Sequence, residues 1–339
     1  MKRRLLDWLA CPVCRGALAL RRAVPDADEI REGELGCTGC SARYAITRGI
    51  PRLLPPAISV EAHATAERFG YEWTRFAEIR PEYEDQMLGW IAPIGRDDFA
   101  GRRVLDAGCG KGRHLRLAAA FGAKEVIGVD LGSAVDVAAH NTADLENVHV
   151  IQGDLTNPPL RGETMDLIYS IGVLHHIPVP EAGFRALAPL LSPGGRFVAW
   201  LYAREGNGWV LALVDPARRL TSQLPLPLVS ALASVITVPL WVALRTLYAP
   251  ARTRPWLARA LPYSSYLMDL APFPFREVHS IAFDQLLAPV AHYMDRAHVE
   301  RCFTEGRLAL ESIRWHHANS WAATGTRAAV PSRTEQYAR

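Results

Sequence analysis

The sequence predicts an α/β protein with a doubly wound, seven-stranded sheet that an antiparallel hairpin completes. Three observations support this prediction. Short apolar runs alternate with helical segments from residue 103 to 202, and two further apolar runs follow near the C-terminal end. The length of 339 residues suits one large domain with appendages. Such alternation places helices on both faces of a parallel sheet, which is a Rossmann-like arrangement.

The chain divides into four parts. Residues 1–56 form a cysteine-rich module that ends at a Pro-Pro pair, and residues 57–100 form a helical cap over the expected ligand site. The α/β domain takes residues 101–205 and 295–328, and residues 206–294 form a helical, proline-rich insert. The seven expected strands are RRVLDAG, EVIGVD, NVHVIQGD, MDLIYSIG, GGRFVAWLY, LALESIRWHH and SWAATGTR. A tight polar turn near Ala318 and Asn319 joins the last two strands, so we expect a hairpin there.

The composition is that of an ordinary globular protein. Hydrophobic residues make up 49% of the chain and charged residues 22%, which excludes a disordered or collagen-like chain. The apolar stretch after Lys2, Arg3 and Arg4 is too short for a signal peptide and has no small-residue cleavage site. We therefore expect a cytoplasmic protein. The net charge of +3 excludes little about its partners.

Four of the six cysteines form two Cys-x-x-Cys pairs, Cys11 with Cys14 and Cys37 with Cys40. Each pair presents two thiolates from one tight turn, and two such turns supply the four ligands of a tetrahedral zinc ion. Disulfides are not expected in a reducing compartment. The sequence therefore predicts a structural Zn²⁺ site on these four cysteines, with two unrelated surface turns or a redox pair as the alternatives.

A glycine-rich loop, VLDAGCGKGRH, follows the first strand of the α/β domain. Its glycines, Gly108, Gly110 and Gly112, lie where the backbone must pass close to a ligand. A dinucleotide-binding loop would have glycine or alanine at position 113, where this sequence has Arg113. The carboxylate of Asp106, at the end of the strand, would repel a pyrophosphate but can hold a ligand ammonium group.

Two more carboxylates end the next two strands. Asp130 lies 22 residues after Gly108, where a carboxylate can accept hydrogen bonds from both hydroxyls of a ribose. Asp154 can accept from the amino group of an adenine, with Leu155 against the ring. The predicted cofactor-binding residues are Asp106, Gly108, Cys109, Gly110, Gly112, Asp130, Leu131, Asp154, Leu155 and Ser170.

In combination, DAGCGKG, Asp130, Asp154 and MDLIYSIGVLHHIP resemble the class I S-adenosylmethionine-dependent methyltransferases, over about residues 65 to 205 and the closing hairpin. The resemblance implies S-adenosyl-L-methionine as the cofactor. The glycine loop would hold its methionine end, Asp130 its ribose and Asp154 its adenine.

The cysteine-rich module also resembles known modules, on the segments LACPVCRGAL and GELGCTGCSARYAITRGIPRLLP. It is similar to the small zinc-ribbon activator subunits of eukaryotic methyltransferases and to their fused bacterial relatives. It also resembles the zinc module of the bacterial large-subunit rRNA guanine-N1 methyltransferases, although that family has a histidine among its ligands.

Methyl transfer depends mostly on alignment and a water-poor site. Where the acceptor is a hydroxyl or an acidic NH, a base helps, and imidazole suits neutral pH. His175 follows the fourth strand, whose carboxyl end opens onto the ligand crevice, so we predict it as the catalytic base. LHHIP also occurs in this family where no base is needed, so His175 need not act as a base, and we expect that one of the two histidines only packs or caps.

Residues 220–244 carry no charged side chain, and this run is long enough to span a bilayer. It contains three prolines and interrupts the α/β domain, so a span would separate two parts of one sheet. We expect a helical lid over the acceptor site, with a peripheral membrane contact and then a dimer interface as alternatives. The oligomeric state is left open.

The expected function is methylation of a small or lipid-like acceptor, at oxygen. One alternative is an RNA-base methyltransferase whose zinc ribbon binds nucleic acid. Residues 1–56 hold ten basic and six acidic residues, which keeps this alternative open, but no lysine-rich or aromatic basic stripe supports it. A second alternative is a non-catalytic module that binds S-adenosylmethionine, against which the three strand-end carboxylates argue. The sequence does not identify the acceptor.

Overall fold

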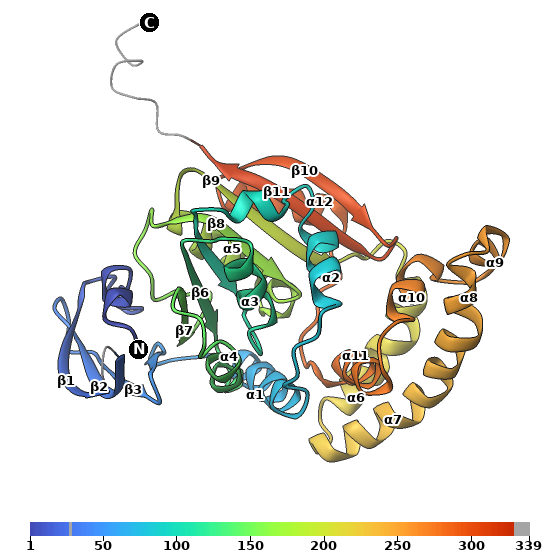
Figure 1. The fold of residues 1–339 in the computed structure, drawn as a ribbon, viewed down its shortest axis with the longest axis horizontal. Helices are drawn as coiled ribbons and strands as arrows, with labels where there is room; N and C mark the ends of the chain where they lie inside the picture. The colour runs from blue at the N-terminus through green and yellow to red at the C-terminus, as the bar shows by residue number, and fades with distance from the viewer. Residues whose placement is uncertain (27–28, 329–339) are drawn as a thin grey trace, which may run out of the picture.

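The computed structural model describes residues 1–26 and 29–328, and one mixed sheet lies at its centre (Figure 1). Among the described residues the sheet has eleven strands, in the order β1-β2-β3-β4-β7-β6-β5-β8-β9-β11-β10. The strands are β1 (Leu18–Asp26), β2 (Glu29–Cys37), β3 (Arg43–Thr47), β4 (Ile50–Leu53), β5 (Arg103–Ala107), β6 (Glu125–Asp130), β7 (Val148–Gly153), β8 (Met165–Ile171), β9 (Leu191–Tyr202), β10 (Leu308–His316) and β11 (Ser320–Arg327).

The seven strands predicted for the α/β domain are β5 to β11, and all of them are present. Strands β7, β6, β5, β8 and β9 run parallel, and β11 lies antiparallel between β9 and β10. The predicted closing hairpin is therefore confirmed. Strand β5 has β6 on one side and β8 on the other, so the chain switches direction across the sheet at this point. In such sheets a ligand crevice opens at the carboxyl ends of the strands.

Neighbouring residues of each strand enter two separate apolar cores on opposite faces of the sheet. Val104 and Val126 join the core formed with α2, α3 and α4, whereas Leu105 and Ile127 join the core formed with α5 and α12. This alternation follows from the two-residue period of a strand. The helices are α2 (Tyr83–Ile91), α3 (Arg113–Ala120), α4 (Ala134–Asn141), α5 (Pro180–Leu187) and α12 (Arg296–Glu305).

The cysteine-rich module continues the central sheet, which the sequence did not indicate. Strand β4 pairs in parallel with β7. The guanidinium of Arg52 strengthens this junction, because it donates to the side chains of Gln152 at 3.1 Å and Asp136 at 2.7 Å. The module therefore covers an edge of the parallel sheet that would otherwise have unpaired backbone groups.

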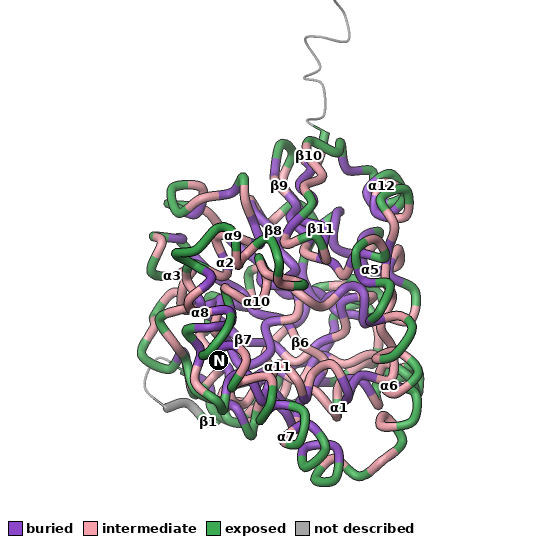
Figure 2. The backbone as a smooth tube through the Cα atoms, turned by 90° about the vertical axis from the view of Figure 1, so that its right-hand side faces the viewer, coloured by how far each residue is buried: buried purple, intermediate pink, exposed green. Residues whose placement is uncertain are grey.

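The helical insert lies between β9 and α12. It consists of two π-helical turns, η5 (Val210–Val214) and η6 (Leu244–Tyr248), and of α6 (Asp215–Thr221), α7 (Leu226–Ala243), α8 (Ala249–Ala251), α9 (Pro255–Ala260), α10 (Ser264–Leu270) and α11 (Phe275–Leu287). Helix α11 lies between α7 and the rest of the protein, and α7 runs along the outer edge (Figure 1). Seen from the side of the insert, the buried backbone concentrates in the central strands (Figure 2).

Helix α1 (Val60–Arg75) connects the insert to the α/β domain, because it packs against both α4 and α11. It begins at Ser59, whose hydroxyl accepts a hydrogen bond from the backbone N–H of Ala62 at 3.1 Å. This N-cap satisfies one of the free amides of the first helical turn. The division of the chain into four parts stays a prediction.

Candidate active site

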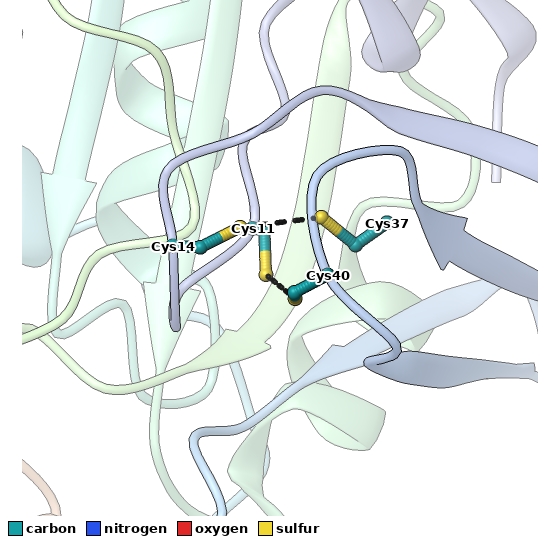
Figure 3. A group of neighbouring side chains, drawn as sticks. All are labelled: Cys11, Cys14, Cys37 and Cys40. Atoms are coloured by element: carbon teal, nitrogen blue, oxygen red, sulfur yellow. Dashed lines mark hydrogen bonds between the residues drawn. The ribbon is translucent and has the colours of Figure 1, made fainter.

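The four cysteines of the two pairs converge in the N-terminal module (Figure 3). Cys11 and Cys14 lie on the loop before β1, Cys37 ends β2, and Cys40 lies on the loop that follows. All four sulfur atoms lie within 4.8 Å of one another. The Sγ atoms of Cys11 and Cys40 are 3.8 Å apart, and those of Cys14 and Cys37 are 3.4 Å apart. All four thiols are free of disulfides.

This cluster fits a structural zinc ion. Four thiolates at about 2.3 Å from a tetrahedral zinc ion stand about 3.8 Å from one another, close to the observed distances. The hydroxyl of Tyr44 lies 3.1 Å from Cys11 Sγ. Burial opposes ionisation of Cys11, but hydrogen bonds from Tyr44 and from the backbone of residues 14 and 13 lower its pKa to about 6. Tyr44 is a supporting residue that the cysteine spacing does not indicate.

A cavity of about 1070 Å³ lies where the carboxyl ends of the parallel strands meet the insert. The loops after β5, β6 and β7 form one wall, and α1, α10, α11 and η5 contribute to the other. Seven of the ten predicted cofactor-binding residues line it: Gly108, Cys109, Gly110, Asp130, Leu131, Asp154 and Leu155. The fold therefore brings most of the predicted cofactor residues to one space.

Two glycines of the loop have different roles. Gly108 has a φ of +94°, and a Cβ at this position would lie 2.3 Å from a methyl group of Val173, so only glycine fits. Gly112 does not line the cavity. Its φ is +83°, and a Cβ there would lie 3.0 Å from the backbone of Ala138 in α4. Gly112 therefore lets the loop pack closely against α4.

Asp106 lies behind the loop, at the end of β5, and is only 1% exposed. Neither carboxyl oxygen has a hydrogen-bond partner among the described residues, and the nearby hydroxyl of Tyr169 is also unpaired. Burial raises the pKa of Asp106 to about 8, and the phenol of Tyr169 opposes this rise only in part. The carboxyl group is therefore protonated at neutral pH. A buried charge without a partner is costly, which is the physical reason why the neutral form of this carboxyl group is favoured.

The carboxylate of Asp130 both lines the cavity and holds the loop. It accepts hydrogen bonds from the backbone N–H groups of Gly110 and Gly132, each at 2.9 Å. A carboxylate has about four acceptor sites, so two remain for a ligand. Asp154 accepts from the backbone and the hydroxyl of Thr156 at 2.8 and 2.6 Å. Thr156 lines the cavity as well.

Ser170 and His175, like Asp106, do not line the cavity. The hydroxyl of Ser170 donates to the backbone carbonyl of Ala107 at 2.8 Å and so ties β8 to β5. His175 is fully buried, and its ring stacks on that of Tyr202 at 4.0 Å between centroids. Neither ring nitrogen has a partner in the part of the chain that the structure describes. Burial holds the pKa of His175 well below its usual value.

The next residue, His176, does line the cavity. Its Nδ1 lies 2.6 Å from the backbone carbonyl oxygen of Val290. Because a carbonyl oxygen can only accept, Nδ1 carries the proton and Nε2 is left as an acceptor. Burial lowers the pKa of His176 to about 4, so the ring is neutral at pH 7. The sequence could not distinguish the two histidines, since the short turn η3 (Leu174–His176) decides which ring meets the cavity.

Sequence reasoning also missed a buried carboxyl group in the cavity wall. Glu72 of α1 is fully buried, and its Oε1 accepts from the hydroxyl of Ser280 of α11 at 2.8 Å, while Oε2 has no partner among residues 1–26 and 29–328. Burial and the neighbouring Asp284 raise the pKa of Glu72 well above its usual value. Glu72 and Ser280 are 208 residues apart, so no local pattern could connect them.

Two cations of the glycine loop also lie in the cavity wall. The Nζ of Lys111 donates to the backbone carbonyl of Phe76 at 2.8 Å and to the hydroxyl of Tyr83 at 2.9 Å. Burial lowers the pKa of Lys111 to about 8. The guanidinium of Arg113 lies over the rings of Trp73, Tyr83 and Trp90. These side chains connect the loop to α1 and α2.

Comparison with known proteins agrees with this geometry. The family described as "Methyltransferase domain" matches residues 105–199, and the family described as "Trm112p-like protein" matches residues 2–49. A tRNA U34 carboxymethyltransferase of Methylococcus capsulatus is 30% identical over 261 residues, which cover 74% of this chain and 68% of that protein. The chain belongs to the S-adenosylmethionine-dependent methyltransferases.

The methyltransferase also resembles proteins with other acceptors. A ubiquinone biosynthesis O-methyltransferase of Pseudomonas putida is 32% identical over 148 residues, which cover 42% of this chain and 62% of that protein. A solved complex between the Haloferax volcanii Trm112 methyltransferase activator and a methyltransferase covers 80% of this chain and 99% of that chain, at 13% identity and a TM-score of 0.45. These relatives differ in their acceptors, so the acceptor class is unresolved. Membership in a family of enzymes argues against the non-catalytic alternative.

The methyltransferase cavity fits S-adenosylmethionine. The two remaining acceptor sites of Asp130 could take the ribose hydroxyls, whereas the carboxyl of Asp106 lies behind the loop and does not line the cavity. Asp154 and Leu155 also line the cavity, where they could contact the adenine. When bound, the cofactor supplies an electrophilic methyl group.

Proposed function

We propose that this methyltransferase modifies a small or lipid-like acceptor, at an oxygen atom. The observation that carries the proposal is the single cavity, in which the cofactor-side residues and a mostly apolar wall from the insert face one space. Ligand pockets typically measure about 300 to 1000 Å³. A cavity of about 1070 Å³ therefore has room for the cofactor together with an acceptor.

The insert supplies the apolar wall. Its apolar and aromatic side chains at the cavity are Trp209, Val210, Val214, Ile236, Leu240, Pro262, Tyr263, Tyr266, Leu267, Leu270, Ile281, Ala282, Leu286 and Tyr293. Only Ile236 and Leu240 belong to the uncharged run 220–244, so the insert as a whole, rather than this run alone, encloses the site. A wall of this kind favours an acceptor with a substantial apolar part.

The charge of the cavity also favours this acceptor class over a polyanion. Five acidic residues line it, and only two basic ones, Lys111 and Arg113. Both cations are already engaged with neighbouring groups. Phosphate groups need free cations, because binding to nucleic acid depends on charge neutralisation. The five acidic residues are Glu72, Asp130, Asp154, Glu277 and Asp284.

A hydroxyl acceptor must lose its proton, and the two adjacent histidines are the groups placed to take it. His175 is our predicted base, and neither of its buried ring nitrogens has a partner among the described residues, but its ring does not line the cavity. His176 offers a free Nε2 at the cavity. Replacing each by asparagine separates the roles: loss of the base should lower kcat at constant cofactor affinity, whereas a packing residue should change stability instead.

RNA methylation is the second candidate function. The tRNA U34 carboxymethyltransferase of Methylococcus capsulatus aligns with 74% of this chain. The aligned region is therefore longer than the α/β domain. The N-terminal module, which matches the Trm112p-like family, has more basic than acidic residues. In this alternative the module would hold RNA while one base enters the cavity.

The experiment is to incubate the full chain and isotopically labelled S-adenosylmethionine with a small-molecule and lipid extract, and separately with total tRNA. We expect label in an organic-soluble product, identified by mass spectrometry, and none in tRNA. Asp130→Ala is the control for label that arises without the cofactor site. Label confined to tRNA would refute the proposal and establish the RNA alternative.

A further inference from the structure

Helix α7 is apolar around its whole circumference but is buried on one side only. A helix of this composition is normally buried on all sides or lies in a membrane. Its buried residues, Val229, Ser230, Ala233 and Thr237, follow helical spacing and face α11. The rest of the circumference exposes Leu228, Leu232, Val235, Val238 and Val242, and Ile236 is exposed at its border with the buried side. We call these six residues the outer face of α7.

The structure argues against α7 as a membrane span. Residues Leu226–Ala251 are long and apolar enough to cross a bilayer. The inner side, however, is held by polar contacts: His279 of α11 lies 3.0 Å from the carbonyl of Ser230 and 3.2 Å from the hydroxyl of Ser234. A span would remove these groups from their partners.

The segment around α7 is strongly basic. Between residues 216 and 268 the sequence has six arginines and no acidic residue. Arg252, Arg254 and Arg259 of the α8–α9 region are exposed and form no ion pair with any residue that the structure describes. Trp256, between them, is 68% exposed. Exposed apolar residues flanked by arginines and tryptophan are typical of surfaces that lie in the interface of an anionic membrane.

The outer face of α7 is continuous with the cavity. Ile236 is 49% exposed and also lines the cavity. Trp209, at the start of the insert, is 51% exposed and lines it too. The same side chains therefore contact both the solvent and the interior of the site. An apolar molecule at this surface could reach the cavity without crossing a polar rim.

We propose that the outer face of α7, with the arginines of the α8–α9 region, docks on the surface of an anionic phospholipid bilayer. Helix α7 then lies along the plane of the membrane, and α8 and α9, which continue from its end at the outer edge of the molecule, bring the arginines to the headgroups (Figure 1). The acceptor is in this case a lipid drawn from the bilayer past Ile236. The docking rests on the surface alone, whereas the lipid acceptor rests on the proposed function.

The test is flotation of the full chain with vesicles of phosphatidylcholine, with and without phosphatidylglycerol. We expect binding to the anionic vesicles that falls at least tenfold between about 0.1 and 1 M salt, because the Debye length shrinks from about 10 to 3 Å. Val235→Asp with Val238→Asp should lower vesicle binding at least tenfold. Neither residue lines the cavity, so S-adenosylmethionine affinity should be unchanged, which also shows that the variant is folded.

Two controls separate the outer face from exposed apolar residues in general. Val24→Asp with Leu310→Asp places the same charges at exposed positions of β1 and β10 and should leave vesicle binding unchanged. Arg252→Gln with Arg254→Gln should weaken binding to anionic vesicles only. Equal effects of the two aspartate pairs, or no binding of the wild type, would overturn the docking.

Two further outcomes are decisive. A wild-type dimer in solution that becomes monomeric in Val235→Asp with Val238→Asp would show that a second copy covers the outer face, and the membrane proposal would be wrong. Vesicle binding together with methyl transfer to tRNA alone would leave the docking in place and refute the lipid acceptor. The failure of the docking is thus distinguishable from the failure of the proposed function.

Discussion

Asp106→Asn tests whether burial keeps the carboxyl group behind the glycine loop neutral. The pKa of Asp106 rises from the ordinary 3.8 to about 8, mainly through burial. Between these two values the folded protein keeps a proton that the unfolded chain has lost. Stability therefore decreases as pH rises through this window and levels off above about pH 8. Asparagine has the shape of the neutral acid but does not titrate, so the variant lacks this decrease.

The magnitude follows from the width of the window. Each pH unit in which only the unfolded chain is ionised costs the folded state about 1.4 kcal/mol. Between pH 5.5 and 7.5 the free energy of unfolding of the wild type should thus fall by about 2.7 kcal/mol relative to Asp106→Asn. Urea denaturation at both pH values measures this difference. Asp97→Asn, at an exposed position, controls for the loss of one negative charge.

Cofactor binding supplies a second readout. If the ammonium group of S-adenosylmethionine pairs with Asp106, the carboxyl must ionise, and calorimetry in two buffers at pH 7 should detect about one proton released per chain. The Asp106→Asn variant should release fewer protons on binding, and its affinity for S-adenosylmethionine should be weaker by about 1.5 to 3 kcal/mol. Parallel pH profiles for the wild type and the variant would refute the reasoning, since the carboxyl would then titrate equally in the folded and unfolded chains.

The remaining predictions concern the zinc site and the glycine loop. Metal analysis should find about one zinc per chain, and Cys37→Ser should abolish it, while Cys109→Ser, outside the cluster, should not. Tyr44→Phe keeps all four thiolates but removes the hydrogen bond to Cys11, so zinc affinity should fall about 10- to 100-fold in a chelator competition. Gly108→Ala and Gly194→Ala both place a side chain at positive φ, but only the first meets another side chain. Denaturation should show a loss of about 1 to 2 kcal/mol for Gly194→Ala and about 1 to 3 kcal/mol more for Gly108→Ala. Similar losses would show that Val173 moves aside without cost.

Local patterns were enough to predict the strands, the closing hairpin and the four cysteines that converge in the N-terminal module. Cys11 and Cys14 act through one turn, and Gly108, Gly110 and Asp106 act through one loop, so their spacing along the chain is also their spacing in space. The period of two in each strand likewise fixes which residues enter which core. These features depend on residues that are close in sequence.

Tertiary structure alone decided the features that depend on distant segments. The pairing of β4 with β7, the contact of Glu72 with Ser280 and the choice of His176 for the cavity wall each join elements that the sequence treats separately. The uncharged run 220–244 predicts an apolar helix. It does not predict which side of that helix packs against the rest of the protein. Only the packing of α7 on α11 shows which of its apolar side chains stay exposed. Whether a side chain is buried depends on the segments that pack against it, and these are far away in the sequence.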